Sequence, residues 1–424
     1  MVRQEIQLNY GAERLEFQVP QANLVGIFRP QPVAACADPL AALAAALRGP
    51  LDTPPLAQLV RPHERIAILV DDHTRTTPAA QILPVVLGEL QRAGVQDEDV
   101  TIVITHGTHR LSSEDEVRHK VGEEVYGRFR IVQHDCQDEE NQVYVGLTSR
   151  GTPVWLNRFV VEADRRIGIG HIGPSPYAGY SGGSKLLIPG VAALDTINAN
   201  HTLVALGVGQ PGVVEVPCRL DIQEGAAFVG LDLVLDVVLN QDEGIVAALA
   251  GTPDEVYRRG VALARRVYEV RCPGAIDIAV TSGYPYELDL YQAERAVEYA
   301  DVVVRKGGSI LLVAPCPDGI GGEEFFRLMA DHTKKPDDYL RDVVRRNGKV
   351  TFSILGYLVA RIKAEKKIYM LTDGISSTDL EAMGFRPVRS LQEGVDALLA
   401  EYGPGARVAV FPMGSSTIPS VEQQ

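Results

Sequence analysis

The sequence lacks the features that mark secreted and membrane proteins. Its five cysteines are scattered, with no C-x-x-C pair and no spacing typical of metal ligands, so we predict reduced thiols. Every uninterrupted apolar stretch is shorter than the roughly 18 residues that a membrane span needs. The first residues, MVRQEIQLNYGAERLEF, alternate like a strand and contain no apolar core of a signal peptide. We therefore expect a cytoplasmic protein with no membrane contact.

Positive charge is also scarce. The 424 residues include 41 Lys and Arg against 55 Asp and Glu, which gives a formal net charge of −14. Nothing in the chain resembles a basic stripe, so we predict no nucleic-acid partner, although a local basic pocket is compatible with this charge. The composition, 46% hydrophobic and 23% charged, is that of a globular protein, and the length predicts two domains.

Strand and helix patterns alternate along both halves of the chain, which predicts parallel sheets covered by helices. A capping-box spacing at Ser112 and Asp115 predicts the start of one helix. We predict an α/β fold of two α/β domains, residues 1–268 and 269–424, with mostly parallel sheets and the active site in the cleft between them. The expected strands are 64–72, 99–107, 128–135, 163–171, 276–283, 309–315, 367–372 and 407–412, and the expected helices include 79–94, 195–206, 253–270 and 289–300.

Unusual polar residues follow the expected strands, at the sheet edge where open α/β proteins bind their ligands. They are Asp71, Asp72 and Arg75 after the first strand, His106 and His109 after the second, His171, Ser175 and Lys185 after strand 163–171, and Tyr284, Gln292 and Arg295 in the second half. Gln292 and Arg295 stand at i and i+3, on one helix face.

Each of these groups also has a simpler explanation. Asp72 and Arg75 would suit a helix cap beside a solvated arginine. A histidine in a glycine-containing turn, such as His109, is often an ordinary loop residue. The dipeptide at 200–201 would suit an exposed helix surface, and so would the pair Gln292 and Arg295.

The segment GYSGGSK, residues 179–185, combines glycines, hydroxyl groups and one lysine with no hydrophobic period. Upstream, G-x-G-x-x-G at 168–173 matches the dinucleotide fingerprint, but Pro174 follows it and no helical period begins there. The Walker A pattern also fails, because a serine precedes Lys185. Two explanations stay open: backbone amides that cradle a phosphate, or a lysine that serves as a covalent attachment point.

Taken together, these motifs resemble the nickel-pincer lactate racemases and the related nickel-dependent 2-hydroxyacid racemases and epimerases. The resemblance covers most of the chain and keeps the family's order. It consists of D-D-x-T-R at 71–75, G-T-H-R at 107–110, A-G-Y-S-G-G-x-K at 178–185, the histidine at 201, G-Y-P with Tyr284, and Y-Q with Gln292.

The resemblance implies two α/β domains with the active site between them. It also implies a nickel pincer built on a pyridinium mononucleotide, bound to Lys185 as a thioamide and ligated through nickel by His201, and proteins that mature this cofactor. The chemistry it implies is hydride transfer from and to the α-carbon of a small hydroxyacid, with His109 as the base for the hydroxyl proton. The residues expected to bind the cofactor are Asp72, Arg75, Ser181, Gly182 and Gly183, and those expected to bind the substrate are Tyr284, Gln292 and Arg295.

This chain departs from the family pattern at sites that matter for the reaction. Ser175 stands where the family has its second catalytic histidine, and an unactivated serine is a poor base. We therefore expect His171 or water to supplement His109. Arg295 replaces a lysine, and the only tryptophan, Trp155, is far from the family's position. These departures indicate a substrate other than lactate, and the alternatives are an oxidoreductase or sugar-type epimerase with the same cofactor, or a binding homologue without catalysis.

Overall fold

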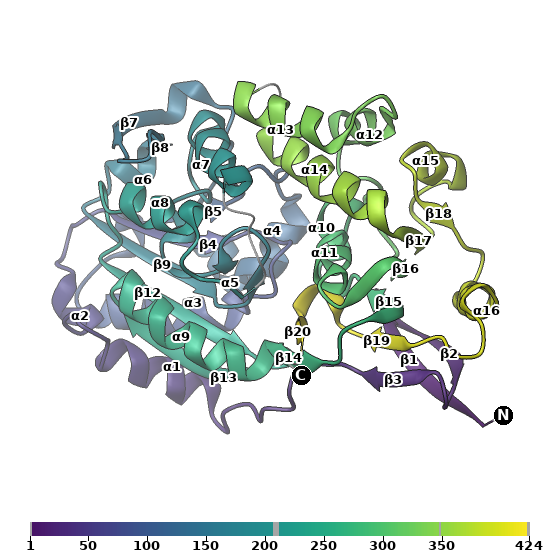
Figure 1. The fold of residues 1–424 in the computed structure, drawn as a ribbon. Coiled ribbons are helices and arrows are strands. Elements are labelled where there is room, and N and C mark those ends of the chain that lie inside the picture. The colour runs from purple at the N-terminus through teal and green to yellow at the C-terminus, as the bar shows by residue number, and fades with distance from the viewer. Residues whose placement is uncertain (1, 207–211, 347–348, 422–424) are drawn as a thin grey trace. The chain divides into compact units, whose positions relative to one another are not determined.

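The computed structural model describes residues 2–206, 212–346 and 349–421, drawn in Figure 1. The chain divides into two compact units. The first unit is Pro32–Val267, and the second unit combines Met1–Gln31 with Tyr268–Gln424. The predicted domain 1–268 thus differs at its N-terminus, because strand β3 (Leu24–Ile27) pairs with a strand from the end of the chain.

The first unit is built on a six-stranded sheet in the order β13-β12-β9-β4-β5-β6. All neighbours are parallel except β12 and β13, which are antiparallel. The sequence patterns predicted the four strands β9, β4, β5 and β6 and overlooked the other two. The strands are β4 (Ile66–Asp71), β5 (Val100–Thr105), β6 (Arg130–Gln133), β9 (Arg165–His171), β12 (Leu233–Leu239) and β13 (Ile245–Gly251).

Helices surround this sheet, and two small antiparallel pairs accompany it. The predicted capping box is one residue off: Ser113 caps α4, accepting from the Glu116 amide, and the Glu116 side chain accepts from the Ser113 amide. The helices are α1 (Pro39–Arg48), α2 (Leu56–Leu59), α3 (Ala79–Arg92), α4 (Glu114–Val121), α5 (Glu123–Arg128), α6 (Arg158–Val161), α7 (Leu194–Leu206), α8 (Pro217–Ala226) and α9 (Pro253–Tyr268), with 3-10 turns η1 (Asp97–Asp99), η2 (Glu139–Asn141) and η3 (Gly183–Leu186). The small pairs are β7 (Gln142–Leu147) with β8 (Pro153–Asn157), and β10 (Pro174–Ser175) with β11 (Gly179–Tyr180).

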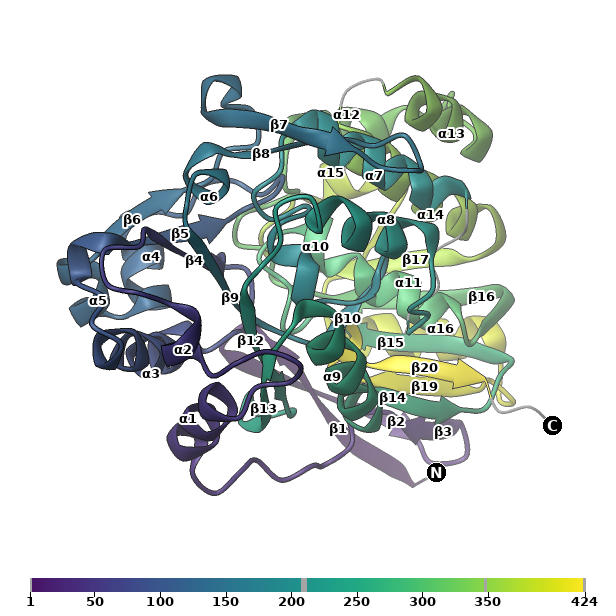
Figure 2. The ribbon, with the colours of Figure 1, turned by 90° about the vertical axis from the view of Figure 1, so that its left-hand side faces the viewer.

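The two faces of this sheet carry different residues because side chains alternate along a strand. On β9, Ile167 and Ile169 belong to the apolar core that also contains residues of α1 and α3. Figure 2 shows these two helices beside the sheet. Gly168 and Gly170 face the other way, where a Cβ would lie 2.7 Å from Leu186 and 2.9 Å from Asp236, respectively. The glycines of the apparent dinucleotide motif therefore make room for packing, and β10 rather than a helix follows them.

The second unit has its own six-stranded sheet, parallel throughout, in the order β18-β17-β16-β15-β19-β3. Its remaining strands are β15 (Ile276–Ser282), β16 (Val304–Val313), β17 (Lys367–Leu371), β18 (Arg386–Pro387) and β19 (Val408–Phe411), and two-stranded sheets pair β1 (Arg3–Tyr10) with β2 (Glu13–Pro20) and β14 (Glu269–Cys272) with β20 (Ile418–Val421). Its helices are α10 (Leu290–Ala293), α11 (Arg295–Asp301), α12 (Glu323–Ala330), α13 (Pro336–Arg345), α14 (Val350–Glu365), α15 (Ser377–Ala382) and α16 (Leu391–Tyr402), with the turn η4 (Gly414–Ser416). In the part of the chain that the structure describes, no helix is long and apolar enough to cross a membrane.

Candidate active site

The lysine of the glycine-rich segment lies in η3 and points to a serine. Lys185 Nζ donates to Ser175 Oγ at 3.0 Å. Ser175 is held by β10, where it pairs with Gly179 of β11, and only 6% of its surface is exposed. The fold therefore brings together the predicted attachment lysine and the serine that replaces the family's histidine.

The hydroxyl and backbone groups that precede Lys185 are engaged within the protein. Ser181 Oγ accepts from the Gly173 amide at 2.9 Å and donates to the His171 carbonyl at 2.8 Å. The Gly182 carbonyl accepts from a buried arginine, and the Gly183 amide donates to a buried aspartate. Since its N–H already has a partner, Gly183 does not present that group to a phosphate in this conformation.

His201 lies in α7 and is buried, with 8% of its surface exposed. The exposed-surface explanation for residues 200–201 is thus wrong, because Asn200 is fully buried as well. Burial and the nearby charge of Lys185 lower the pKa of His201 to about 3. The imidazole is therefore neutral near pH 7, the form that binds metals. The ring of Tyr177 meets it edge to face at a centroid distance of 5.6 Å.

Asn200 fixes the helix that carries His201. Its Nδ2 donates to the Cys218 carbonyl at 3.0 Å and to Asp221 Oδ2 at 2.9 Å, and its Oδ1 accepts from the Cys218 thiol at 3.1 Å. Both partners lie on α8 and are buried. These contacts tie α7 to α8 and so set the position of the neighbouring histidine.

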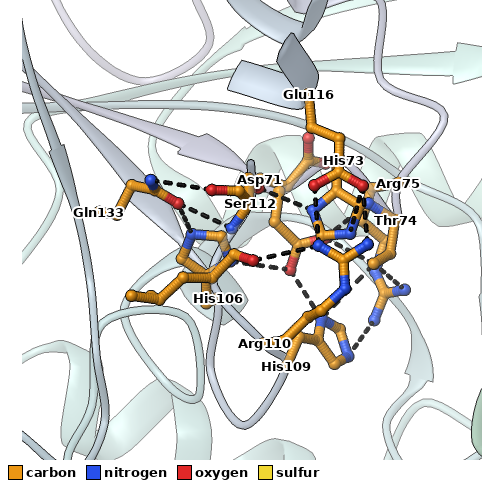
Figure 3. Close-up of polar contacts among 12 residues, drawn as sticks. Asp71, His73, Thr74, Arg75, His106, His109, Arg110, Ser112, Glu116 and Gln133 are labelled. Atoms are coloured by element: carbon orange, nitrogen blue, oxygen red, sulfur yellow. Dashed lines mark hydrogen bonds and ion pairs between the residues drawn. The ribbon is translucent and has the colours of Figure 1, made fainter. Parts of the chain in front are cut away.

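Asp72 and His109 form a close pair at the carboxyl ends of β4 and β5, in the region shown in Figure 3. Asp72 Oδ2 lies 2.6 Å from His109 Nδ1, and Arg75 Nη2 lies 3.3 Å from His109 Nε2. Burial alone would raise the pKa of Asp72, but His109 and Arg75 outweigh it and hold the pKa well below its usual range. An ionised Asp72 accepts a proton carried on Nδ1, so in the uncharged form of the ring Nε2 is the acceptor nitrogen.

His106, the other histidine of this loop, has a supporting position. Its Nε2 lies 2.9 Å from Gln133 Oε1, a contact visible in Figure 3, and its Nδ1 lies 3.8 Å from Asp72 Oδ2. Burial lowers the pKa of His106 to about 4, so the ring is neutral. It packs beside Asp72 with only 1% of its surface exposed.

A second aspartate–histidine link connects Asp71 to His171 through the hydroxyl of Thr77. Thr77 Oγ1 donates to Asp71 Oδ2 and lies 2.7 Å from His171 Nδ1. Because the hydroxyl has a single proton, which Asp71 accepts, His171 donates from Nδ1, so in the uncharged form of the ring Nε2 is the acceptor nitrogen. Lys120 Nζ lies 2.7 Å from Asp71 Oδ1, and Lys120 and His171 lower the pKa of Asp71 against the effect of burial.

Thr77 and Lys120 also belong to this link, and no sequence motif predicted them. Lys120 is on α4, only 7% exposed, and its Nζ also donates to the Arg75 and Thr77 carbonyls at 2.9 and 3.2 Å. The available signal was the doubled aspartate at the end of β4: consecutive strand residues point to opposite sides and can serve two partners.

In the second unit, the expected substrate-binding residues follow β15. Gln292 lies in α10 and is 3% exposed, so the exposed-face explanation is wrong for it. Arg295 Nε donates to the Gln292 carbonyl at 3.0 Å, and its guanidinium carbon lies 4.2 Å from the centroid of the Tyr286 ring. The Tyr284 amide donates to Ser282 Oγ at 3.1 Å. The arginine, at the start of α11, is therefore oriented by a carbonyl of the preceding helix α10 and by an aromatic face.

Among the described residues, no group of three His, Cys, Asp or Glu side chains is placed to hold a metal ion. His201 is thus not part of a protein-only site of the kind that binds structural zinc. A metal at His201 would need further ligands from a non-protein group.

Comparisons with known proteins identify the family of this chain. The family model described as the lactate racemase N-terminal domain matches residues 10–210, and that of the lactate racemase C-terminal domain matches residues 270–419. The lactate racemase of Thermoanaerobacterium thermosaccharolyticum is 30% identical over 424 residues, which cover 97% of this chain and 98% of that protein. The lactate racemase of Lactiplantibacillus plantarum is 29% identical over 378 residues, which cover 88% of this chain and 89% of that protein.

Solved structures give the same result. The lactate racemase apoprotein of T. thermosaccharolyticum superposes with a TM-score of 0.89 at 28% identity, covering 98% of this chain and 100% of that one. A Thermotoga maritima protein, 17% identical, covers 87% of this chain and 96% of its own with a TM-score of 0.70, which shows the fold alone. With both domains and nearly the full length matched, this chain belongs to the lactate racemase family, whose named members are isomerases.

Proposed function

We propose that this protein is a nickel-pincer-dependent racemase or epimerase that acts on a 2-hydroxyacid other than lactate. The observation that carries the proposal is the environment of Lys185. Its amine is hydrogen-bonded to Ser175. Burial and the charge of this lysine lower the pKa of His201 and keep that histidine neutral. Membership in the lactate racemase family supports the racemase class.

The residues fit a lysine-tethered nickel pincer. Lys185 supplies the amine for covalent attachment, and its hydrogen bond to Ser175 holds that amine in place. His201 supplies one neutral nitrogen ligand, and the remaining ligands would come from the cofactor itself, in keeping with the absence of a protein cluster of three ligands among the described residues. When bound, such a cofactor provides a carbon that accepts a hydride from the substrate and returns it.

His109 is the proposed base for the substrate hydroxyl. Asp72 holds the Nδ1 proton, so Nε2 is the nitrogen that takes up the hydroxyl proton, and Asp72 stabilises the imidazolium that results. Arg75 Nη2 lies 3.3 Å from this Nε2. A bound substrate would take the place of that contact and bring its negative charge beside Arg75.

His171 is the proposed second base, in place of the family's histidine at position 175. Its Nδ1 is fixed through Thr77 by Asp71, as the Nδ1 of His109 is fixed by Asp72. Ser175, with its hydroxyl bonded to Lys185, would then hold the attachment lysine rather than accept a proton. Two oriented bases would serve the two enantiomers.

The substrate class follows from the second unit and from the departures in the first. Arg295, oriented by the Gln292 carbonyl and the Tyr286 ring, would bind the substrate carboxylate with a two-pronged geometry that lysine lacks. Tyr284 and Gln292 would complete the contacts to substrate. We propose a larger or polyhydroxylated 2-hydroxyacid, and cofactor-maturation proteins that load the enzyme.

The proposal is tested by incubating cofactor-loaded protein with single enantiomers of a panel of 2-hydroxyacids deuterated at the α-carbon. Chiral chromatography should show the opposite enantiomer with the deuterium retained, because a hydride relay does not exchange with solvent. Accumulation of the keto acid would instead indicate a net oxidoreductase. Loss of deuterium to water would contradict hydride transfer, and inversion of lactate faster than every larger acid would contradict the substrate assignment.

A further inference from the structure

In the glycine-rich segment, the carbonyl and the amide of one peptide bond are both hydrogen-bonded to buried charged side chains. The carbonyl of Gly182 accepts from Arg219 Nη1 at 3.2 Å, and the amide of Gly183 donates to Asp236 Oδ2 at 2.7 Å. These are the two polar groups of a single peptide unit, which is planar. Holding both fixes the orientation of the peptide plane directly before the turn η3 that carries Lys185.

Both side chains are removed from water. Asp236 lies in the middle of β12 and is fully buried, and Arg219 on α8 is 1% exposed. The guanidinium carbon of Arg219 lies 3.4 Å from the centroid of the Tyr257 ring, and Tyr257 Oη donates to the Ala178 carbonyl at 3.2 Å. The same arginine–tyrosine stack thus contacts the residue just before the glycine-rich segment and the centre of that segment.

This arrangement is costly for the folded state. Within the described residues, Asp236 Oδ1 and both Nε and Nη2 of Arg219 have no hydrogen-bond partner. Burial raises the pKa of Asp236 to about 6 and lowers the pKa of Arg219. A buried polar atom without a partner destabilises a protein. A loop with no further role would not need two buried charged side chains that carry such atoms.

The glycines around the pair leave the space that it needs. A Cβ at Gly182 would lie 2.7 Å from Asp236 Oδ2, and a Cβ at Gly183 would lie 3.3 Å from Arg219 Nη2. Both glycines have positive φ, +86° and +59°. A side chain at Gly170 on β9 would meet Asp236 Oδ1 at 2.9 Å. The glycine pattern therefore matches close approach by these two side chains.

We infer that Arg219 and Asp236 are positioning residues for Lys185: by holding the Gly182–Gly183 peptide, they present the lysine amine to the cofactor. Lys185 follows Gly183 within the same 3-10 turn, so the start of the turn sets where its side chain begins. The inference rests on the proposed function for the identity of the cofactor, whereas the geometry of the pair does not depend on it.

The experiment measures Lys185 in two ways. In the apoprotein, acylation of Lys185 by a small N-hydroxysuccinimide ester is followed by peptide mass spectrometry. In parallel, covalent cofactor attachment is followed by intact mass after expression with pincer-synthesis proteins. Asp236→Leu should raise the acylation rate, because the released lysine leaves Ser175, and lower attachment, each by about tenfold. Asp236→Asn, which keeps an acceptor for the Gly183 amide, should stay within about twofold of wild type.

Asp277→Leu is the matched control, because Asp277 is a buried aspartate of the second unit that accepts from the Arg407 amide at 2.7 Å. It should destabilise the protein and leave Lys185 acylation unchanged. Wild-type values for Asp236→Leu in both assays would overturn the inference, and so would an equal rise in the acylation of all lysines. If wild type itself takes up no cofactor, the proposed function fails, while the apoprotein assay still decides whether the pair positions Lys185.

Discussion

The carboxylate of Asp72 lies 2.6 Å from Nδ1 of His109, and this contact determines which nitrogen of the histidine is left to act on a substrate. The preceding residue, Asp71, has the same effect on His171 through the hydroxyl of Thr77. Neighbouring residues at the end of one strand thus orient two histidines, each with Nε2 as its acceptor. Under the proposed function, His171 would be the second base in place of the serine at position 175.

Asp72→Asn should reduce turnover by the loaded enzyme on the order of 100-fold or more, because the amide no longer selects the Nδ1–H tautomer of His109. The tautomer is read directly from ¹⁵N chemical shifts of the His109 ring in the apoprotein. Asp232→Asn, at a partly exposed ion pair with Arg165, is the control and should leave both measurements unchanged. A turnover within twofold of wild type would show that Asp72 does not orient His109 for catalysis.

Thr77→Val should lower turnover by about tenfold, because it removes the hydroxyl between Asp71 and His171 while keeping the volume of the side chain. The ¹⁵N shifts of His171 should then report a mixture of tautomers. Thr101→Val on β5 makes the same chemical change away from this link and serves as the control. If Thr77→Val alters neither measurement, His171 is not an oriented base.

Asn200→Ala should reduce the free energy of unfolding by roughly 1–3 kcal/mol, since the Cys218 carbonyl and thiol lose a buried partner. Urea denaturation provides the measurement. Asn141→Ala, which removes a single contact to Asp138 at a partly exposed site, should cost less than about 0.5 kcal/mol. Equal effects of the two substitutions would show that Asn200 does not anchor α7.

Glu287 in the second unit should make stability depend on pH. Burial raises its pKa from 4.5 to about 7, although the Gly11 amide, 2.6 Å from Oε1, acts in the opposite direction. The folded state therefore binds more protons than the unfolded state between about pH 4.5 and 7, and stability contributed by this group is complete below that range and lost as pH rises through it.

Glu287→Gln should remove this loss. Its free energy of unfolding relative to wild type should rise between pH 5 and pH 8 by roughly 3 kcal/mol at most. Urea denaturation at the two pH values tests the sign. A difference that stays constant, or that falls toward pH 8, would contradict the assignment.

Much of the first sheet could be predicted from sequence because the apolar run of each strand and the polar residues at its end are local signals. The same signals placed Asp72, His109 and Lys185 at one sheet edge. Strand β12 was missed although LVLDVVL is such a run, and the charge within it, Asp236, was the clue to a buried carboxylate.

Pairing between distant segments could not be predicted in this way. Strand β3 joins the second sheet through β19, some 380 residues later, and no local pattern identifies that partner. Arg219 and Lys120 likewise look like ordinary basic residues of amphipathic helices until the fold buries them. Their partners are a glycine peptide and a strand-end carboxylate, which neither periodicity nor motif spacing brings together.

The central claim is tested most directly by the intact mass and nickel content of the protein expressed with and without pincer-synthesis proteins. Wild type should acquire a nickel-bearing adduct, Lys185→Ala should lose it, and Lys306→Ala, at an exposed lysine, should retain it. His201→Ala should keep the organic adduct and lose most of the nickel. An unchanged wild-type mass, while a known lactate racemase is loaded in parallel, would contradict the assignment of this chain as a nickel-pincer enzyme.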